Sequence, residues 1–135
     1  MPANAMREEK FRNVQRGWFD INGKRIFFRS KWEANYALYL DFLVKNKQIK
    51  KWEYEKDIFL FEKIKNGTRS YRPDFKIYNL DETYHYDEVK GWLTPKSKTQ
   101  LNRMRIYYPK IVLNVIDRKS YGAIKRKIGK ILHFF

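Results

Sequence analysis

The sequence contains no cysteine. This absence excludes a disulfide framework and any zinc site built on thiolates, and it suits a reducing compartment. Only two histidines are present, His85 and His133, and their separation matches no metal-ligand spacing. No apolar run approaches the roughly 20 residues of a membrane-spanning helix. The first residues lack the apolar stretch of a signal peptide, so we expect a cytoplasmic protein.

Acidic side chains are scarce relative to basic ones. Fifteen Asp and Glu face thirty Lys and Arg, which leaves a net charge of +15. Such an excess favours a phosphate backbone as partner, because each contact of a basic side chain with phosphate releases counterions. Aromatic residues, 18% of the chain, are interleaved with the basic ones and can stack on bases. We therefore expect a nucleic acid partner; a solvated basic surface or attraction to anionic lipid are the alternatives.

The length and the apolar content predict one folded domain. A chain of 135 residues that is 43% hydrophobic can bury one core. Residues 1–16 are polar and predict a flexible basic arm, so that residues 17–135 would form the domain. No repeat or linker divides that segment.

Local patterns predict the order of helices and strands. The pair Asn22-Gly23 separates two short apolar runs, which predicts a hairpin of strands at 17–21 and 24–28. Helical spacing predicts a helix over 30–46, with Ser30 as its N-cap. The following patterns predict one or two strands in 49–64, a strand in 69–78 and a returning strand in 83–92. A helix is expected from about Thr94 to before Pro109, and a buried strand in 110–117. The chain is expected to close with a C-terminal helix whose apolar face includes Ile131 and Phe135. The expected fold class is α/β, a central mixed sheet flanked by helices.

Acidic residues gather in the two strands around the turn at 79–82. Because side chains alternate along a strand, Glu88 and Lys90 share one face, and the turn brings Asp74 near Glu88. Two carboxylates on adjacent strands repel each other unless a cation, a shared proton or a basic neighbour compensates. Mg²⁺ bound through oxygen is the natural cation, and a lysine beside it can hold a water or steady a developing phosphate charge. The pattern suits phosphodiester hydrolysis, with ordinary cross-strand ion pairs as the alternative.

The motif "RPDF…DEVKG" resembles the signature of the PD-(D/E)XK nuclease superfamily, which has the restriction-endonuclease-like fold. The preceding "INGKRIFFRSKWEANYALYLDFL" is similar to small phage-encoded nucleases of this superfamily, including phage Holliday junction resolvases. The resemblance covers roughly residues 17–117. It implies a Mg²⁺-dependent DNA endonuclease in which Mn²⁺ can substitute. It further implies a homodimer that cuts branched or four-way DNA during phage recombination in the cytoplasm of a prokaryotic host.

The resemblance also implies roles for particular residues. Asp74 and Glu88 would bind the Mg²⁺ ion, together with the main-chain carbonyl of Val89. Lys90 would position the attacking water and steady the pentavalent phosphorane. Glu33 would complete the site from the helix, through a second metal or a water.

Two acids near this motif have alternative interpretations. Glu33 stands three residues after Ser30, so a capping box would explain it without catalysis. Asp87 adjoins Glu88 and could be mistaken for the ligand, but alternation places it on the face opposite Lys90.

The C-terminal third supplies most of the expected contacts with the DNA backbone. From Lys96 to Lys130, eleven Lys or Arg residues accompany one acid, Asp117. Trp92 follows Gly91, and we assign it to the core rather than to stacking on a base. The side chains expected to contact nucleic acid are Lys31, Arg72, Lys96, Lys98, Arg103 and Arg105.

A junction endonuclease is therefore the preferred interpretation of the sequence. A non-specific or sequence-specific DNA endonuclease of the same fold is the second. A basic nucleic-acid-binding module without catalysis, in which the acids are ion pairs, is the third.

Overall fold

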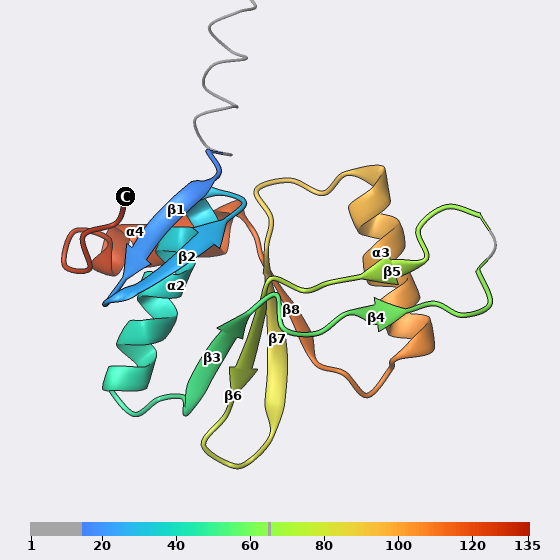
Figure 1. The fold of residues 1–135 in the computed structure, drawn as a ribbon, viewed down its shortest axis with the longest axis horizontal. Helices are drawn as coiled ribbons and strands as arrows, with labels where there is room; N and C mark the ends of the chain where they lie inside the picture. The colour runs from blue at the N-terminus through green and yellow to red at the C-terminus, as the bar shows by residue number, and fades with distance from the viewer. Residues whose placement is uncertain (1–14, 65) are drawn as a thin grey trace, which may run out of the picture.

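The computed structural model describes residues 15–64 and 66–135 (Figure 1). Most of the arm expected over residues 1–16 therefore lies outside the described residues. The described part is a mixed α/β fold, as expected, with three helices and a central mixed sheet of four strands. The strand order is β3-β6-β7-β8, with bounds Lys51–Tyr54, Phe75–Tyr78, Tyr84–Val89 and Leu113–Ile116.

The central sheet combines three antiparallel strands with one parallel strand. β3, β6 and β7 are antiparallel neighbours, and β8 runs parallel to β7 at the edge of the sheet. Phe75 pairs with Asp87, so Asp74, one residue before β6, lies opposite Glu88. The sequence predicted a buried strand for β8; as an edge strand it is only partly buried.

The strand predicted over 69–78 is two strands in the structure. β5 (Ser70–Tyr71) pairs with β4 (Phe59–Leu60) in a separate two-stranded ribbon, whereas β6 pairs with β3. The chain crosses between the two sheets at 72–74, where Pro73 has no amide hydrogen to donate to a ladder.

The N-terminal hairpin was predicted correctly. β1 (Gly17–Ile21) and β2 (Lys24–Phe28) are antiparallel, and the two turn residues have positive φ, 50° at Asn22 and 90° at Gly23. This conformation is the one for which Asn-Gly is favoured. One face of the hairpin buries Ile21 and Phe28 in the core.

Helix α2 (Lys31–Lys45) runs beside the hairpin and contacts both it and the central sheet (Figure 1). Ser30 is its N-cap, as predicted, and its side chain accepts a hydrogen bond from the amide of Glu33. Ala37 and Leu40 are almost completely buried and pack with Phe75 of the sheet. This packing holds α2 against the central sheet.

A second hydrophobic cluster lies under β4, β5 and helix α3 (Pro95–Tyr107), to the right of the sheet in Figure 1. Its buried members are Phe61, Tyr71 and Met104. Thr94 caps α3 and Pro95 is its first residue, as predicted. The two clusters thus sit on either side of β7.

Helix α4 (Arg118–Ile128) is shorter than the predicted C-terminal helix. Beyond Ile128 the chain forms turns, and His133 has a positive φ of 56° that reverses its direction. The reversal lets the amide of Phe135 donate to Asn35 Oδ1 at 2.7 Å. Ile131, assigned by the sequence to the apolar helix face, is consequently 71% exposed. Among the described residues, no helix has the length and apolar character to cross a membrane.

Candidate active site

Asp74 and Glu88 form a buried pair of carboxylates where β6 begins and β7 ends. Only 8% of Asp74 and 3% of Glu88 is exposed. The main-chain amide of Val89 donates to Asp74 Oδ2 at 2.8 Å, and the hydroxyl of Tyr71 donates to the Glu88 carboxylate. Burial, and then the negative charges of Glu88 and Glu33, raise the pKa of Asp74 well above its usual range. The acids that the sequence predicted to meet therefore do meet, at a position where a cation would relieve their repulsion.

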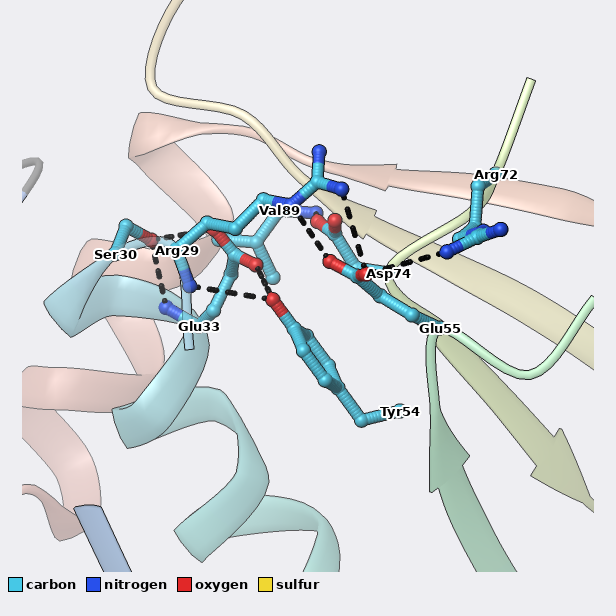
Figure 2. Close-up of polar contacts among 8 residues, drawn as sticks. All are labelled: Arg29, Ser30, Glu33, Tyr54, Glu55, Arg72, Asp74 and Val89. Atoms are coloured by element: carbon cyan, nitrogen blue, oxygen red, sulfur yellow. Dashed lines mark hydrogen bonds and ion pairs between the residues drawn. The ribbon is translucent and has the colours of Figure 1, made fainter. Parts of the chain in front are cut away.

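Glu33 reaches the same region from the first turn of α2, and its side chain points toward Tyr54 (Figure 2). Its carboxylate accepts hydrogen bonds from the hydroxyls of Ser30, at 2.8 Å, and Tyr54, at 2.5 Å. Burial raises the pKa of Glu33, as does the charge of Glu88, while the two hydroxyls oppose that shift. The Ser30 side chain caps the helix and also donates to the Glu33 carboxylate, and Glu33 is buried.

Asp87 lies on the other face of β7, as alternation predicted. Its carboxylate accepts hydrogen bonds from the Tyr36 hydroxyl at 2.6 Å and from Asn114 Nδ2 at 3.2 Å. These two hydrogen bonds satisfy the acceptor oxygens of a carboxylate that is buried in the packed sheet. Asp87 is thereby separated from the face that carries Glu88 and Lys90.

One cleft of roughly 840 Å³ gathers the predicted catalytic residues. It lies between the first turn of α2, the end of β7 and the segment around β5 and the start of α3. Lys90, the residue after β7, lines it together with the carboxylates. The site residues that line this cleft are Glu33, Asp74, Glu88, Val89 and Lys90. We call this space the carboxylate cleft.

Arg29 and Arg72, which line the carboxylate cleft, both pair with Glu55 (Figure 2). Arg29 Nε lies 2.9 Å from one carboxylate oxygen of Glu55, and Arg72 lies 3.9 Å from the other. The Arg29 side chain is 64% exposed and that of Arg72 is 46% exposed, so both guanidinium groups remain open to solvent. The amide of Glu55 donates to the carbonyl of Asp74 at 2.7 Å, which ties this arginine pair to the start of β6.

The six expected nucleic-acid contacts do not all gather at the cleft. Arg72 and Lys96 line it. Arg103 instead donates to the carbonyl of Thr68 in the loop between β4 and β5. Arg105 lines a different cavity with Met104, because residues along a helix point in different directions. Lys31 and Lys98 also lie outside the cleft lining.

Several contributors were not found from the sequence. Arg16 and Arg29 also line the carboxylate cleft. The hydroxyls of Tyr54 and Tyr71 orient two of the carboxylates, and burial raises the pKa of both tyrosines well above the usual range, so they remain donors. Trp92, assigned to the core by the sequence, is 50% exposed because it lies in the loop between β7 and α3.

The donor set fits an ion that takes few protein ligands. Within residues 15–64 and 66–135, no group of three or more His, Cys, Asp or Glu side chains has the arrangement of a metal cage. Asp74 and Glu88 offer two carboxylates, beside which the carbonyl of Val89 is a further oxygen donor. Mg²⁺ commonly binds through one or two carboxylates, keeps several waters and takes the rest of its ligands from substrate phosphate. The oxygen donors at this position are of the type that Mg²⁺ takes from proteins.

The fold and the cleft together define a mixed α/β protein with buried acids beside a lysine and a basic rim. Residues 9–123 match the model of DUF1064, a family of proteins of unknown function, and the chain belongs to that family. No curated protein and no solved structure matches the chain.

Proposed function

We propose that the protein is a Mg²⁺-dependent DNA endonuclease with a restriction-endonuclease-like core. The observation that carries this proposal is the convergence of Asp74, Glu88 and Lys90 in one cleft with arginines at its edge. The β6–β7 pairing supports it, since that register places the two acids opposite each other. The resemblance of the sequence to PD-(D/E)XK nucleases points to the same chemistry.

The residues of the carboxylate cleft would have separate roles in cleavage. Asp74, Glu88 and the Val89 carbonyl would hold Mg²⁺ or Mn²⁺, which when bound polarises a phosphoryl oxygen and acidifies a water. Lys90 lines the same cleft as Glu88, where its ammonium group would hold the attacking water and offset negative charge on the phosphorane. Tyr71 keeps the Glu88 carboxylate oriented by its hydrogen bond. Glu33 contributes a third negative charge from α2.

The rim of the cleft would bind the DNA backbone. Arg29 and Arg72 present partly exposed guanidinium groups, which suit bidentate contacts with phosphate. Lys96 adds charge from the first turn of α3. The net charge of +15 would strengthen binding through counterion release.

A homodimer would supply the two sites that cleavage of a branched substrate requires. One chain carries one carboxylate cleft among its described residues, whereas resolving a four-way junction requires two symmetric nicks. A two-fold dimer supplies two sites from one gene product. We therefore prefer a junction-resolving endonuclease to a non-specific or sequence-specific DNA endonuclease of the same fold.

The surroundings of the acids argue against a binding module whose carboxylates are only ion pairs. In the described residues, the ion pairs give neither Asp74 nor Glu88 a basic partner. Their hydrogen-bond donors are a main-chain amide and a tyrosine hydroxyl. Burying two acids together raises the free energy of the folded state unless a proton is shared between them or a cation binds. A cation-dependent activity gives a reason for that arrangement, which a passive binding surface does not.

A panel of DNA substrates tests the proposal. Linear, flapped and four-way DNA of matched sequence would be incubated with the protein in Mg²⁺, in Mn²⁺ and in excess chelator. We expect nicks in both metal ions, no cleavage in chelator, and fastest cleavage of the four-way substrate. Binding of all three substrates without cleavage of any would favour the non-catalytic module.

A further inference from the structure

A smaller cavity of roughly 230 Å³ opens beside the carboxylate cleft. Its own lining residues are Trp32, Gly91 and Trp92, and we call this cavity the tryptophan notch. Five further residues line both spaces: Ser30, Glu33, Val89, Lys90 and Thr94. The notch is therefore continuous with the place where the phosphate is expected.

One wall of the tryptophan notch is held firmly. The ring of Trp32 stacks on Tyr121, with ring centroids 4.2 Å apart and planes inclined by only 10°. Gly91 lets the chain pass close to this ring, because a Cβ at that position would lie 3.2 Å from Trp32 Cζ3. Trp32 is thus a pre-positioned aromatic surface.

The other wall is exposed. Trp92 is 50% accessible although it follows the last residue of β7 by only three positions. Trp92 lines the same cavity as Trp32, so its exposed ring adds a second aromatic surface to the notch. The position of Trp92 gives it access to a molecule that occupies the cleft.

We propose that the tryptophan notch binds an unpaired nucleobase adjoining the phosphate that occupies the carboxylate cleft. This inference rests on the proposed nuclease function and narrows its substrate class. A base is joined to its phosphate through a single sugar, so its site must adjoin the phosphate site. Every base has a flat π-face that stacks on aromatic rings without sequence preference. A base inside a duplex must leave its stack to enter such a cavity, so an unpaired nucleotide is favoured.

The charges around the notch favour a nucleotide over an apolar peptide or a second copy of the chain. Lys90 and Glu33 line the notch as well as the cleft. An apolar partner would bury these groups without compensating them, which costs free energy. A nucleotide would place its base against the aromatic side chains of the notch and its phosphate next to Lys90. The preferred substrate is therefore DNA with an unpaired nucleotide at the cut, as at a bulge or a branch point.

Binding measurements without metal test this inference separately from cleavage. Fluorescence anisotropy in excess chelator would compare three labelled DNAs: a full duplex, the same duplex with one bulged nucleotide, and the bulged duplex with that base removed. The proteins would be the wild type, Trp92→Ala, Trp92→Phe and Trp18→Ala. Trp18 is a matched control, since it is 61% exposed and lies outside the lining of both spaces.

We expect the wild type to bind the bulged DNA at least about fivefold more tightly than the same DNA lacking the base. Trp92→Ala should abolish that difference, Trp92→Phe should retain part of it, and Trp18→Ala should keep it. A wild type that cleaves DNA but binds the two bulged forms equally would overturn the base site and leave the nuclease function intact. Retention of the full difference by Trp92→Ala would also overturn it. Failure of the wild type to bind any of the three DNAs would reject both proposals.

Discussion

The main-chain amide of Val89 donates a hydrogen bond to the carboxylate of Asp74 across 2.8 Å. Since Val89 directly follows Glu88, one short segment of β7 fixes the orientation of Asp74 and also presents the second acid. The amide acts on the ionised form of Asp74, and it opposes the burial and repulsion that raise the pKa of that acid. The pair is thus held in place by the sheet itself.

Replacing Asp74 with Asn should stabilise the metal-free protein at neutral pH. The folded-state pKa of Asp74 is raised, so the acid favours folding while protonated, and that contribution is lost as the pH rises through the raised pKa. The asparagine side chain cannot ionise, so the difference between variant and wild type should grow as the pH rises above about 4. Thermal unfolding in excess chelator would measure this difference in stability. Each kcal/mol of added stability would raise the unfolding midpoint by about 2–8 °C.

The Asp81→Asn variant is the matched control for this stability measurement. Hydrogen bonds from Thr83 lower the pKa of Asp81, so its ionised form favours folding and that contribution is lost as the pH falls. Asp81→Asn should therefore not stabilise the protein at neutral pH. If Asp74→Asn also gave no increase in the midpoint between about pH 5 and 8, the two buried carboxylates would not be repelling each other.

Glu33→Gln should reduce cleavage far more than it reduces thermal stability. The amide is close in shape to the carboxylate, and the cap of α2 is supplied by the Ser30 side chain. We expect the rate to fall by at least about a hundredfold, the order of a general acid–base or charge-stabilising contribution. Single-turnover cleavage and a melting curve would be measured on the same preparation.

Ser30→Ala provides the comparison for Glu33. Loss of an N-cap costs about 0.5–2 kcal/mol of stability, so this variant should melt earlier. It should keep most of its cleavage rate, because the negative charge of Glu33 remains and Tyr54 still donates to it. Wild-type cleavage by Glu33→Gln would instead assign Glu33 to helix capping.

Glu55→Gln should tighten DNA binding. The Glu55 carboxylate is shared between Arg29 and Arg72, and removing its charge would leave both guanidinium groups available for phosphate. The plot of log affinity against log salt concentration should become steeper by about one for each added phosphate contact. Glu53→Gln removes the same charge from β3, where Lys51 and Lys56 are the partners, and it should change the slope less. Equal effects of the two variants would mean that DNA binding depends on the net charge of the protein and not on the freed arginine pair.

The protein should be a homodimer that cuts four-way junctions in preference to linear duplex. Light scattering on the free protein would give the mass of the assembly. A gel would compare a four-way junction with a linear duplex of the same sequence. A monomer that cuts both at similar rates would favour a general endonuclease of this fold.

Features with local causes could be predicted from the sequence. The hairpin follows from Asn22-Gly23, and the start of α2 follows from Ser30, because turns and caps depend on a few adjacent residues. The meeting of Asp74 with Glu88 followed from one short turn and the alternation of side chains.

Features that depend on distant contacts could not be predicted in the same way. The end of α4 depends on Phe135 meeting Asn35, which stands 100 residues earlier in the chain. The pairing of Arg29 with Glu55 joins the end of β2 to the segment after β3, and no periodic pattern encodes it. The exposure of Trp92 depends on how the loop before α3 leaves the sheet, whereas its apolar character alone suggested burial.

Cleavage of DNA by the wild type and by Asp74→Ala, Glu88→Ala and Lys90→Ala tests the central claim most directly. Each protein would be assayed with four-way DNA in Mg²⁺ and in excess chelator, and binding would be measured on the same samples. We predict Mg²⁺-dependent nicking by the wild type only, with DNA binding by the three variants largely retained because the basic rim is unchanged. Wild-type cleavage in excess chelator, or undiminished cleavage by the Asp74 and Glu88 variants, would contradict the assignment of these carboxylates to a catalytic Mg²⁺ site.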